Sequence, residues 1–434
     1  MNAIMRMMRV RKPISAALGA AILMLGFAAL GGGSGTNFGD PLPGLTPDLQ
    51  ARFAAGLANF QSPDDPTTGL GPVFNNTPCS SCHSTGAVGG GSNLVETRYG
   101  TVTNGVFDPL AQYGGSLIHA QGIGSSFNGV PFTTPNGTVV NFVGEIVPQP
   151  PAVPNGPATI VAGRRTTPLF GLGLVDAVSD DTFQNLANLE RFLSPETAGR
   201  VNVVSDVFAD GQDPQARAGR FGWKAQHSTL FAFAGDAYLN EIGITTPLFP
   251  NENVPQDPNE GRLVNPALLA ANPGPAVGPD NTNDPDNASL SQFTDFMTFL
   301  APPPKLALTD QARSGAQTFF AIGCANCHVP TLTTGPNSIP QLDQVRFHPF
   351  SDFLVHDMGS LGDGIAQGGV GQTEMRTAPL WGVRILPSFL HDGRASTLSE
   401  AILFHAGQGQ DARDRFANLE ADDQANLIAF LNSL

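Results

Sequence analysis

The spacing of apolar residues predicts that each half of the chain opens with an amphipathic helix. In the first half, Thr46 is the expected cap and Pro47 takes the first helical position, where a missing N–H is tolerated. The residues on one face of this helix are Leu49, Phe53, Leu57 and Phe60. In the second half, Thr309 is the expected cap, and the inward-facing residues are Ala312, Ala316, Phe319 and Phe320. Both sets follow the helical period, so each helix is expected to cover an apolar core.

Each half is also expected to close with a helix. The apolar stripes of these helices are Phe293, Met297 and Leu300 in the first half, and Leu427, Leu431 and Leu434 in the second. Residues 296–300 (Phe-Met-Thr-Phe-Leu) resemble residues 427–431 (Leu-Ile-Ala-Phe-Leu). Two further pairs of segments match: 165–171 with 376–382, and 228–230 with 396–398. These repeats predict a duplicated domain, and the last pair places Trp223 opposite His391.

Long polar segments interrupt the first half. Residues 266–287 are rich in Pro, Asn and Asp, and three prolines at 302–304 mark a boundary. We therefore expect one domain over 35–304, enlarged by inserted loops, and a second over 305–434. Within the polar segment, calcium could bind to Asp280, Asn283, Asp284 and Asp286, although polar turns have the same composition.

Two Cys-x-x-Cys-His motifs account for all four cysteines: Cys79-Ser-Ser-Cys82-His83 and Cys324-Ala-Asn-Cys327-His328. This is the attachment signature of c-type haem, in which two thiols bond the porphyrin and the histidine takes one side of the iron. A structural zinc site would need four ligands in one place, whereas the two pairs lie far apart in the sequence. A helix, a haem motif, loops and a closing helix form the plan of a cytochrome c domain. The chain is thus expected to be mainly α, with two cytochrome c-like haem domains and two covalent haems.

The first 34 residues read as a secretory signal peptide. Four basic residues precede a short apolar run at 14–30 that is rich in Ala and Gly. The run is short for a membrane anchor, and no later segment is expected to cross a membrane. Export to the periplasm agrees with covalent haem. The formal net charge of −15 disfavours nucleic acid and suits a basic partner, such as a small cytochrome.

His405 is the leading candidate for the sixth ligand of the second haem. Residues 397–400 form a capping box, which places His405 about two turns along a helix among apolar neighbours. A buried histidine that bonds a backbone carbonyl would have the same pattern. Met358 is the alternative ligand, and it would give the haem a higher potential than histidine would.

The first copy lacks this histidine. The register of the repeats places Ala237 opposite His405, and alanine cannot bind iron. The first haem is therefore expected to keep an open distal side, where peroxide or oxygen could bind. His119 could still act as a distal ligand, although its spacing is not diagnostic.

Trp223 and Glu241 are candidates for catalytic roles. Trp223 could lie between the haems and relay an electron, or it could be a core residue. Glu241 could be the group that takes a proton from one peroxide oxygen and returns it to the other, or a solvated carboxylate.

Several strings give the chain a resemblance to the bacterial di-haem oxidoreductases, often labelled thiol oxidoreductases or peroxidases. These strings lie at residues 71–83, 219–225, 240–245, 323–330, 355–359, 376–382 and 390–395. The family is similar in turn to di-haem cytochrome c peroxidases. In those relatives a His-Asp-Gly string precedes the second haem's sixth ligand by 14 residues, which here leads from His391 to His405.

The resemblance also bears on the two catalytic candidates. In the peroxidases a tryptophan lies between the haems and a glutamate about 20 residues later assists peroxide cleavage, and Trp223 and Glu241 occupy similar places. Two departures put the peroxidase electron donor in doubt: Lys224 stands where the peroxidases have aspartate, and the expected sixth ligand is histidine.

The expected function is that of a periplasmic di-haem oxidoreductase. The second haem (His328 and His405) would take electrons from a small redox protein, and the first (His83) would reduce hydrogen peroxide. The alternatives are an electron carrier without a substrate, an oxygenase acting on a hydrocarbon, and an enzyme that oxidises a partner protein.

Overall fold

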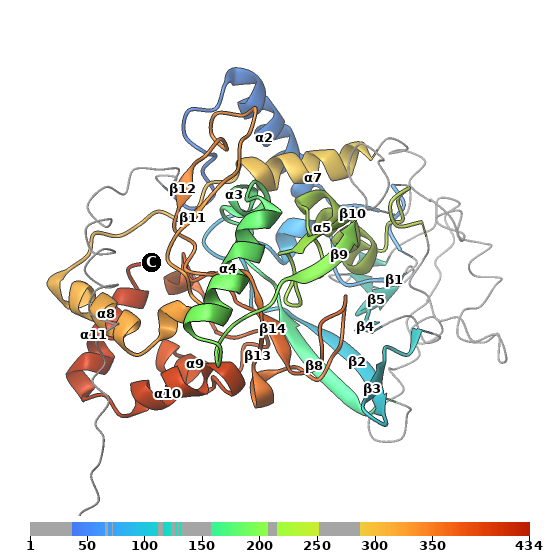
Figure 1. Ribbon diagram of the computed structural model, residues 1–434. Coiled ribbons are helices and arrows are strands. Elements are labelled where there is room, and N and C mark those ends of the chain that lie inside the picture. The colour runs from blue at the N-terminus through green and yellow to red at the C-terminus, as the bar shows by residue number, and fades with distance from the viewer. Residues whose placement is uncertain are drawn as a thin grey trace, which may run out of the picture.

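The computed structural model describes residues 37–434 apart from 66–67, 72, 112–115, 123–125, 128–129, 132–157, 207–214 and 251–286 (Figure 1). The expected signal peptide and the candidate calcium ligands, at 280–286, lie outside the described residues. Within the described ranges, none of the helices has the length and apolar character needed to span a membrane.

The opening and closing helices of the first half are α2 (Pro47–Phe60) and α7 (Ala288–Phe299), as predicted. The Thr46 hydroxyl accepts a hydrogen bond from the N–H of Leu49, which satisfies one of the free donors of the first turn. Side chains from the two helices interlock through rings whose centroids lie 4.9–6.2 Å apart: Phe53, Phe60, Phe293 and Phe296. Gly56 allows the close approach, because a Cβ there would lie 2.2 Å from the Gln292 carbonyl oxygen.

The second half repeats this arrangement with α8 (Asp310–Ala321) and α11 (Ala421–Leu431), which Figure 1 shows side by side in orange and red. The Thr309 hydroxyl accepts from Ala312, and Gly315 lies against the backbone of Asn426. The two short helices between them are α9 (Leu398–Leu403) and α10 (Gln410–Ala417). The predicted helices are confirmed, although Leu300 and Leu434 follow the helix ends rather than lying within them.

The described residues of the first half contain three more α-helices. They are α3 (Leu172–Asp176), α4 (Asp180–Leu193) and α5 (Leu230–Ala237), and α5 continues into a π turn, Tyr238–Ile242. The hydrophobic core around α2, α5 and α7 also contains Leu332, Phe347 and Phe353 from the second half. The expected boundary near 304 therefore separates two helical clusters in sequence, while loops of the second half pack into the core of the first.

The inserted segments carry a sheet that the sequence did not predict. Its antiparallel strands are β2 (Val95–Thr103), β3 (Val106–Asp108), β4 (Leu117–Ile118) and β8 (Ile160–Arg165), and β2 pairs with the other three. The pairing of β2 with β8 brings Glu96 opposite Arg164. Other strands form two-stranded pairs: Val73–Phe74 with Gln121–Gly122, Ser126–Phe127 with Val130–Pro131, Asn202–Asp206 with Gln215–Gly219, Leu332–Thr333 with Arg346–Phe347, and Val355–Asp357 with Glu374–Arg376.

Gly315→Ala tests the helix crossing of the second half. A Cβ at this position would lie 1.8 Å from the carbonyl oxygen of Asn426, so α8 and α11 must separate. We expect the free energy of unfolding to fall by about 1–3 kcal/mol, although alanine is favoured over glycine inside a helix. Denaturant titration of the haem-loaded protein measures this change.

Gly335→Ala is the matched control, because its Cβ would lie 3.5 Å from the nearest atom, the Ala177 carbonyl oxygen. That variant should unfold at the wild-type denaturant concentration. A Gly315→Ala protein as stable as the wild type would contradict the tight crossing.

Candidate functional site: two haem cavities that share a wall

Each Cys-x-x-Cys-His motif borders a cavity. The cavity at the second motif, called here the C-terminal cavity, has a volume of about 460 Å³, and the cavity at the first motif, the N-terminal cavity, about 360 Å³. Both volumes are in the range of cofactor sites. The attachment residues predicted from the sequence all line their cavities: Cys79, Cys82 and His83 in one, and Cys324, Cys327 and His328 in the other.

A single helical turn at each motif aims its three functional side chains the same way. The turns are Cys79–Ser81 and Cys324–Asn326, and in each the carbonyl of the first cysteine accepts from the N–H of the motif histidine, at 3.1 and 3.0 Å. None of the four cysteines is in a disulfide. Two thiols and one imidazole on the same wall are the set that covalent haem requires.

The motif histidines are neutral and oriented through their Nδ1 atoms. His83 Nδ1 lies 3.2 Å from the Gly90 carbonyl oxygen, and His328 Nδ1 lies 3.0 Å from that of Phe350. Burial lowers the pKa of both imidazoles to about 4. A histidine that donates Nδ1–H to a carbonyl keeps a lone pair on Nε2, as an iron ligand must.

His405 lies across the C-terminal cavity from His328. The capping box at Thr397 starts α9 as predicted, but the helix ends at Leu403, so His405 follows it rather than lying within it. His405 Nδ1 is 2.8 Å from the Ala401 carbonyl oxygen, which again leaves Nε2 free. The centroids of the two imidazole rings are 6.5 Å apart. Metal–nitrogen bonds of about 2 Å on both sides would separate the ring centres by roughly 6 Å, so the pair fits one iron.

Met358, the alternative ligand, lines the same cavity. Both its methyl group and the His405 ring approach Gly409. Because the His405 ring lies opposite the His328 ring at a distance that fits one iron, the geometry favours His405 as the sixth ligand.

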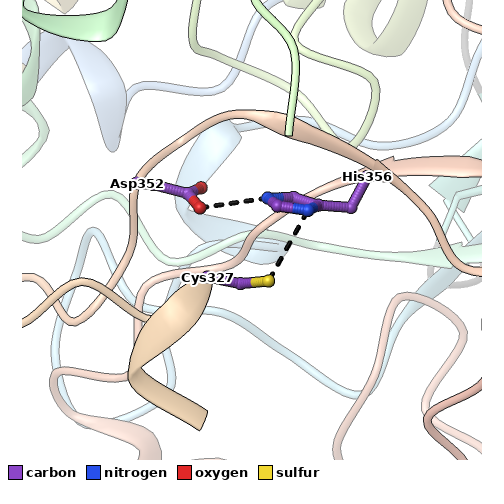
Figure 2. Close-up of side chains that lie close together, drawn as sticks. All are labelled: Cys327, Asp352 and His356. Atoms are coloured by element: carbon purple, nitrogen blue, oxygen red, sulfur yellow. Dashed lines mark hydrogen bonds and ion pairs between the residues drawn. The ribbon is translucent and has the colours of Figure 1, made fainter. Parts of the chain in front are cut away.

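The half-buried Cys327 lies beside two buried side chains, those of His356 and Asp352 (Figure 2). The Cys327 sulfur is 3.5 Å from His356 Nδ1, and His356 Nε2 is 3.0 Å from an Asp352 oxygen. Burial alone would lower the pKa of His356, but the Asp352 carboxylate holds it well above the ordinary value. These three residues have the donors of a metal site. A thioether bond at Cys327 would leave the sulfur unavailable as a metal ligand. The three residues are therefore better described as surroundings of the C-terminal haem.

The N-terminal cavity contains a cluster of polar side chains that the sequence revealed only in part. Glu241, in the π turn, accepts a hydrogen bond of 2.6 Å from the Asn75 amide. Its carboxyl is also hydrogen-bonded to that of Glu96, which Arg98 grips through two bonds of 2.8 and 3.1 Å. The sequence did not reveal Glu96 and Arg98. The alternation Glu-Thr-Arg places both charged side chains on one face only if the segment is a strand, and no strand was predicted there.

The two carboxyls differ in their affinity for a proton. Burial favours the neutral form of both, but Arg98 lowers the pKa of Glu96 to about 2. Burial and the neighbouring Glu96 charge raise the pKa of Glu241 well above its ordinary value. Glu96 is therefore the more acidic member of the pair, and Glu241 is the member that holds a proton more strongly.

Among the described residues that line the N-terminal cavity, His83 is the only histidine. Ala237 lies in the cavity wall, at the position that corresponds in register to His405. His119 is buried beside Glu96 and Arg98, but only its neighbours Ile118 and Ala120 contribute to the wall.

Trp223 lines both cavities. Its indole N–H donates to the Arg165 carbonyl at 2.8 Å, and its ring meets His391 edge-on at a centroid distance of 6.2 Å. The next residue, Lys224, is fully buried and forms an ion pair of 2.9 Å with Asp363. The lysine that departs from the peroxidase pattern is thus a structural cation of the shared wall.

His405→Ala tests the proposed pair of axial imidazoles. In the haem-loaded ferric protein we expect one haem, half of the total, to change from low spin to high spin, because its iron loses a ligand. Electron paramagnetic resonance and visible absorption measure the change. His348→Gln is the control. His348 Nδ1 lies 2.9 Å from the Thr331 hydroxyl oxygen, and His348 lines neither cavity. A spin change in Met358→Leu but not in His405→Ala would identify methionine as the ligand.

Comparison with known proteins agrees with these cavities. Residues 158–434 match the family described as "Di-haem oxidoreductase, putative peroxidase". The matched range includes Trp223, Glu241, the second haem motif and His405, and the first motif precedes it. No curated protein matches the chain.

Solved structures show only loose similarity. A hydrazine synthase from Kuenenia stuttgartiensis is 20% identical with a TM-score of 0.25, over 34% of this chain and 55% of that one. The di-haem peroxidase BthA from Burkholderia thailandensis is 17% identical, with a TM-score of 0.29, over 51% of this chain and 67% of that one. A variant of BthA is 15% identical, with a TM-score of 0.36, over 88% and 85%. These scores are too low for residue-by-residue comparison. The family match covers most of the chain, and the chain therefore belongs to the di-haem oxidoreductase family.

Proposed function

We propose that this chain is a periplasmic peroxidase that reduces hydrogen peroxide at the N-terminal cavity with electrons relayed through the C-terminal one. The observation that carries the proposal is the difference between the cavities. His405 faces His328 in one, whereas His83 is the only histidine among the described residues lining the other. An iron with two imidazole ligands is saturated and suits electron transfer, while an iron with one keeps a position for a small molecule. The periplasmic location rests on the expected signal peptide.

The residues of each motif would hold one haem. Cys79 and Cys82 would form thioether bonds in the N-terminal cavity, with His83 on the iron. The corresponding residues of the C-terminal cavity are Cys324, Cys327, His328 and His405. When bound, the haem of the N-terminal cavity supplies an iron that takes up hydrogen peroxide and passes electrons to it.

Glu241 would supply a proton during this reaction. Reduction of hydrogen peroxide to two water molecules consumes two electrons and two protons, and the departing oxygen leaves most easily as water. The Glu241 carboxyl lines the cavity, and its surroundings raise its pKa well above the ordinary value, which favours the protonated form. The Asn75 amide fixes one of its oxygens, so that the carboxyl keeps one orientation.

Electrons would enter from a small redox protein and cross the shared wall at Trp223. Among the described residues, two aromatic side chains line both cavities, and they are Trp223 and Phe233. The formal net charge of −15 favours a basic donor, such as a small cationic cytochrome.

Glu241→Gln tests the proposed reaction. Mixing the reduced wild-type protein with hydrogen peroxide in a stopped-flow spectrometer should oxidise both haems rapidly. The variant should react about 10²–10⁴-fold more slowly, because glutamine cannot donate a carboxyl proton. Glu190→Gln, which changes another buried carboxyl, should keep the wild-type rate.

Two results would contradict the proposal. A reduced wild-type protein that ignores both peroxide and carbon monoxide would be an electron carrier with two saturated irons. A protein that is isolated with oxygen stably bound and cleaves a hydrocarbon would be an oxygenase.

Trp223→Phe tests the relay. Phenylalanine keeps an aromatic ring but loses the N–H bond to Arg165, so electron passage between the haems should slow while both haems stay bound. Time-resolved absorption after peroxide addition follows each haem separately. Trp381→Phe is the control, since Trp381 lines only the C-terminal cavity. Equal interhaem rates in both variants would remove Trp223 from the path.

A further inference from the structure

Two half-buried carboxyls meet in the N-terminal cavity, and they come from different elements. Glu96 belongs to β2, and Glu241 belongs to the π turn after α5. The carboxyls are hydrogen-bonded to each other, and both line the cavity. A hydrogen bond between two carboxyl groups requires a proton on one of them.

The partners of the two carboxyls decide where that proton resides. Arg98 offers Glu96 a fork of two charge-assisted hydrogen bonds, at 2.8 and 3.1 Å. Glu241 has the neutral Asn75 amide, at 2.6 Å. A guanidinium stabilises a carboxylate far more than an amide does, so Glu96 is the ionised member of the pair and Glu241 the acid.

We propose that Glu96 is a second catalytic residue: it takes the first proton from hydrogen peroxide while Glu241 gives its own proton to the departing oxygen. This inference rests on the proposed function. The O–O bond breaks, its electron pair leaves with the oxygen that Glu241 protonates, and that oxygen departs as water. The other oxygen takes two electrons from the redox-protein donor and two protons from solvent, and it leaves as a second water. The proton on Glu96 then passes along the hydrogen bond to Glu241, which restores the pair.

A pair divides a task that a lone carboxyl would have to perform in sequence. A single glutamate must be ionised to accept a proton and then protonated to return it, and a buried glutamate that starts protonated cannot begin. Two adjacent carboxyls in unlike surroundings provide base and acid at the same pH.

Arg98 is the positioning residue of this pair. Its guanidinium holds Glu96 in the ionised form without needing to touch the peroxide. The other titratable or charged groups that act on the pair within the described residues are Arg164, Asp236, His119 and Cys82. Burial lowers the pKa of His119 to about 4, so its imidazole is neutral at neutral pH. In the haem-loaded protein the Cys82 sulfur would be in a thioether bond and would carry no charge.

Infrared spectroscopy of the haem-loaded protein locates the proton without turnover. At neutral pH we expect the carboxyl pair to give a carboxylic-acid C=O band that disappears in Glu241→Gln and persists, shifted, in Glu96→Gln. Glu190→Gln identifies the separate band of Glu190, whose pKa burial raises to about 8. Loss of the cavity band in Glu96→Gln but not in Glu241→Gln would reverse the two roles and overturn the proposal.

Hydrogen cyanide tests the base separately from the acid. It binds ferric haem as the anion, so its proton must go to a group in the cavity. Association should slow by about 10²-fold in Glu96→Gln, and it should stay close to the wild-type rate in Glu241→Gln. Equal rates in the wild type and Glu96→Gln would overturn the assignment of the base.

Hydrogen peroxide separates this inference from the proposed function. If the wild type reacts and Glu96→Gln reacts equally fast, the protein is a peroxidase but Glu96 is not its base. If the wild type does not react, the proposed function fails, and the infrared and cyanide results still decide the state of the pair. Should Glu96→Gln not fold, Arg98→Lys replaces it: the acid limit of cyanide binding should move to higher pH, because the fork that keeps Glu96 ionised is lost. An unmoved limit would overturn the role of Arg98.

Discussion

The wall between the two cavities depends on one buried carboxylate, Asp363. It accepts a hydrogen bond of 2.8 Å from Arg164 and forms an ion pair of 2.9 Å with Lys224, and all three side chains are buried. Arg164 precedes the residue whose carbonyl receives the Trp223 indole, and Lys224 follows Trp223. A carboxylate from the second half thus fixes two segments of the first half on either side of the tryptophan. Removing one member of a buried ion pair leaves an uncompensated charge and costs about 3–5 kcal/mol, so this contact is hard to rearrange.

Matching strings in the two halves take the same local structure. The strings at 165–171 and 376–382 both end in a glycine with left-handed backbone, Gly171 (φ 73°) and Gly382 (φ 69°), and each glycine caps a short helix. Thr229 and Thr397 cap α5 and α9 through the same bond, in which the hydroxyl accepts from the N–H three residues later, at 3.1 Å in both. The repeated strings therefore share the residues that begin helices. The two halves differ in the segments between these residues.

The parts of the fold that the sequence predicted are those encoded locally. Helix caps, apolar stripes and the Cys-x-x-Cys-His turns each need only a few consecutive residues, and His405 was proposed from a capping box and from the spacing to His391 that the family resemblance implies. Glu96, Arg98 and Asp363 escaped prediction because their meaning comes from partners distant in sequence. Glu96 looks like a surface charge until β2 and the π turn bring it to Glu241. The short strands gave equally little signal, since most consist of only two or three residues.

The π turn after α5 has a consequence for how the two cavities diverge. Both α5 and α9 begin at a capped threonine, but α9 ends at Leu403 and the chain turns His405 towards the facing histidine. In the first half the coil runs on through Tyr238–Ile242 and carries an acid, Glu241, into the cavity. In the proposed enzyme, a difference of about two helical turns thus distinguishes the electron-transfer site from the catalytic site. The two sites of this proposal therefore share the haem motif and differ in how far the helix after the capping threonine extends.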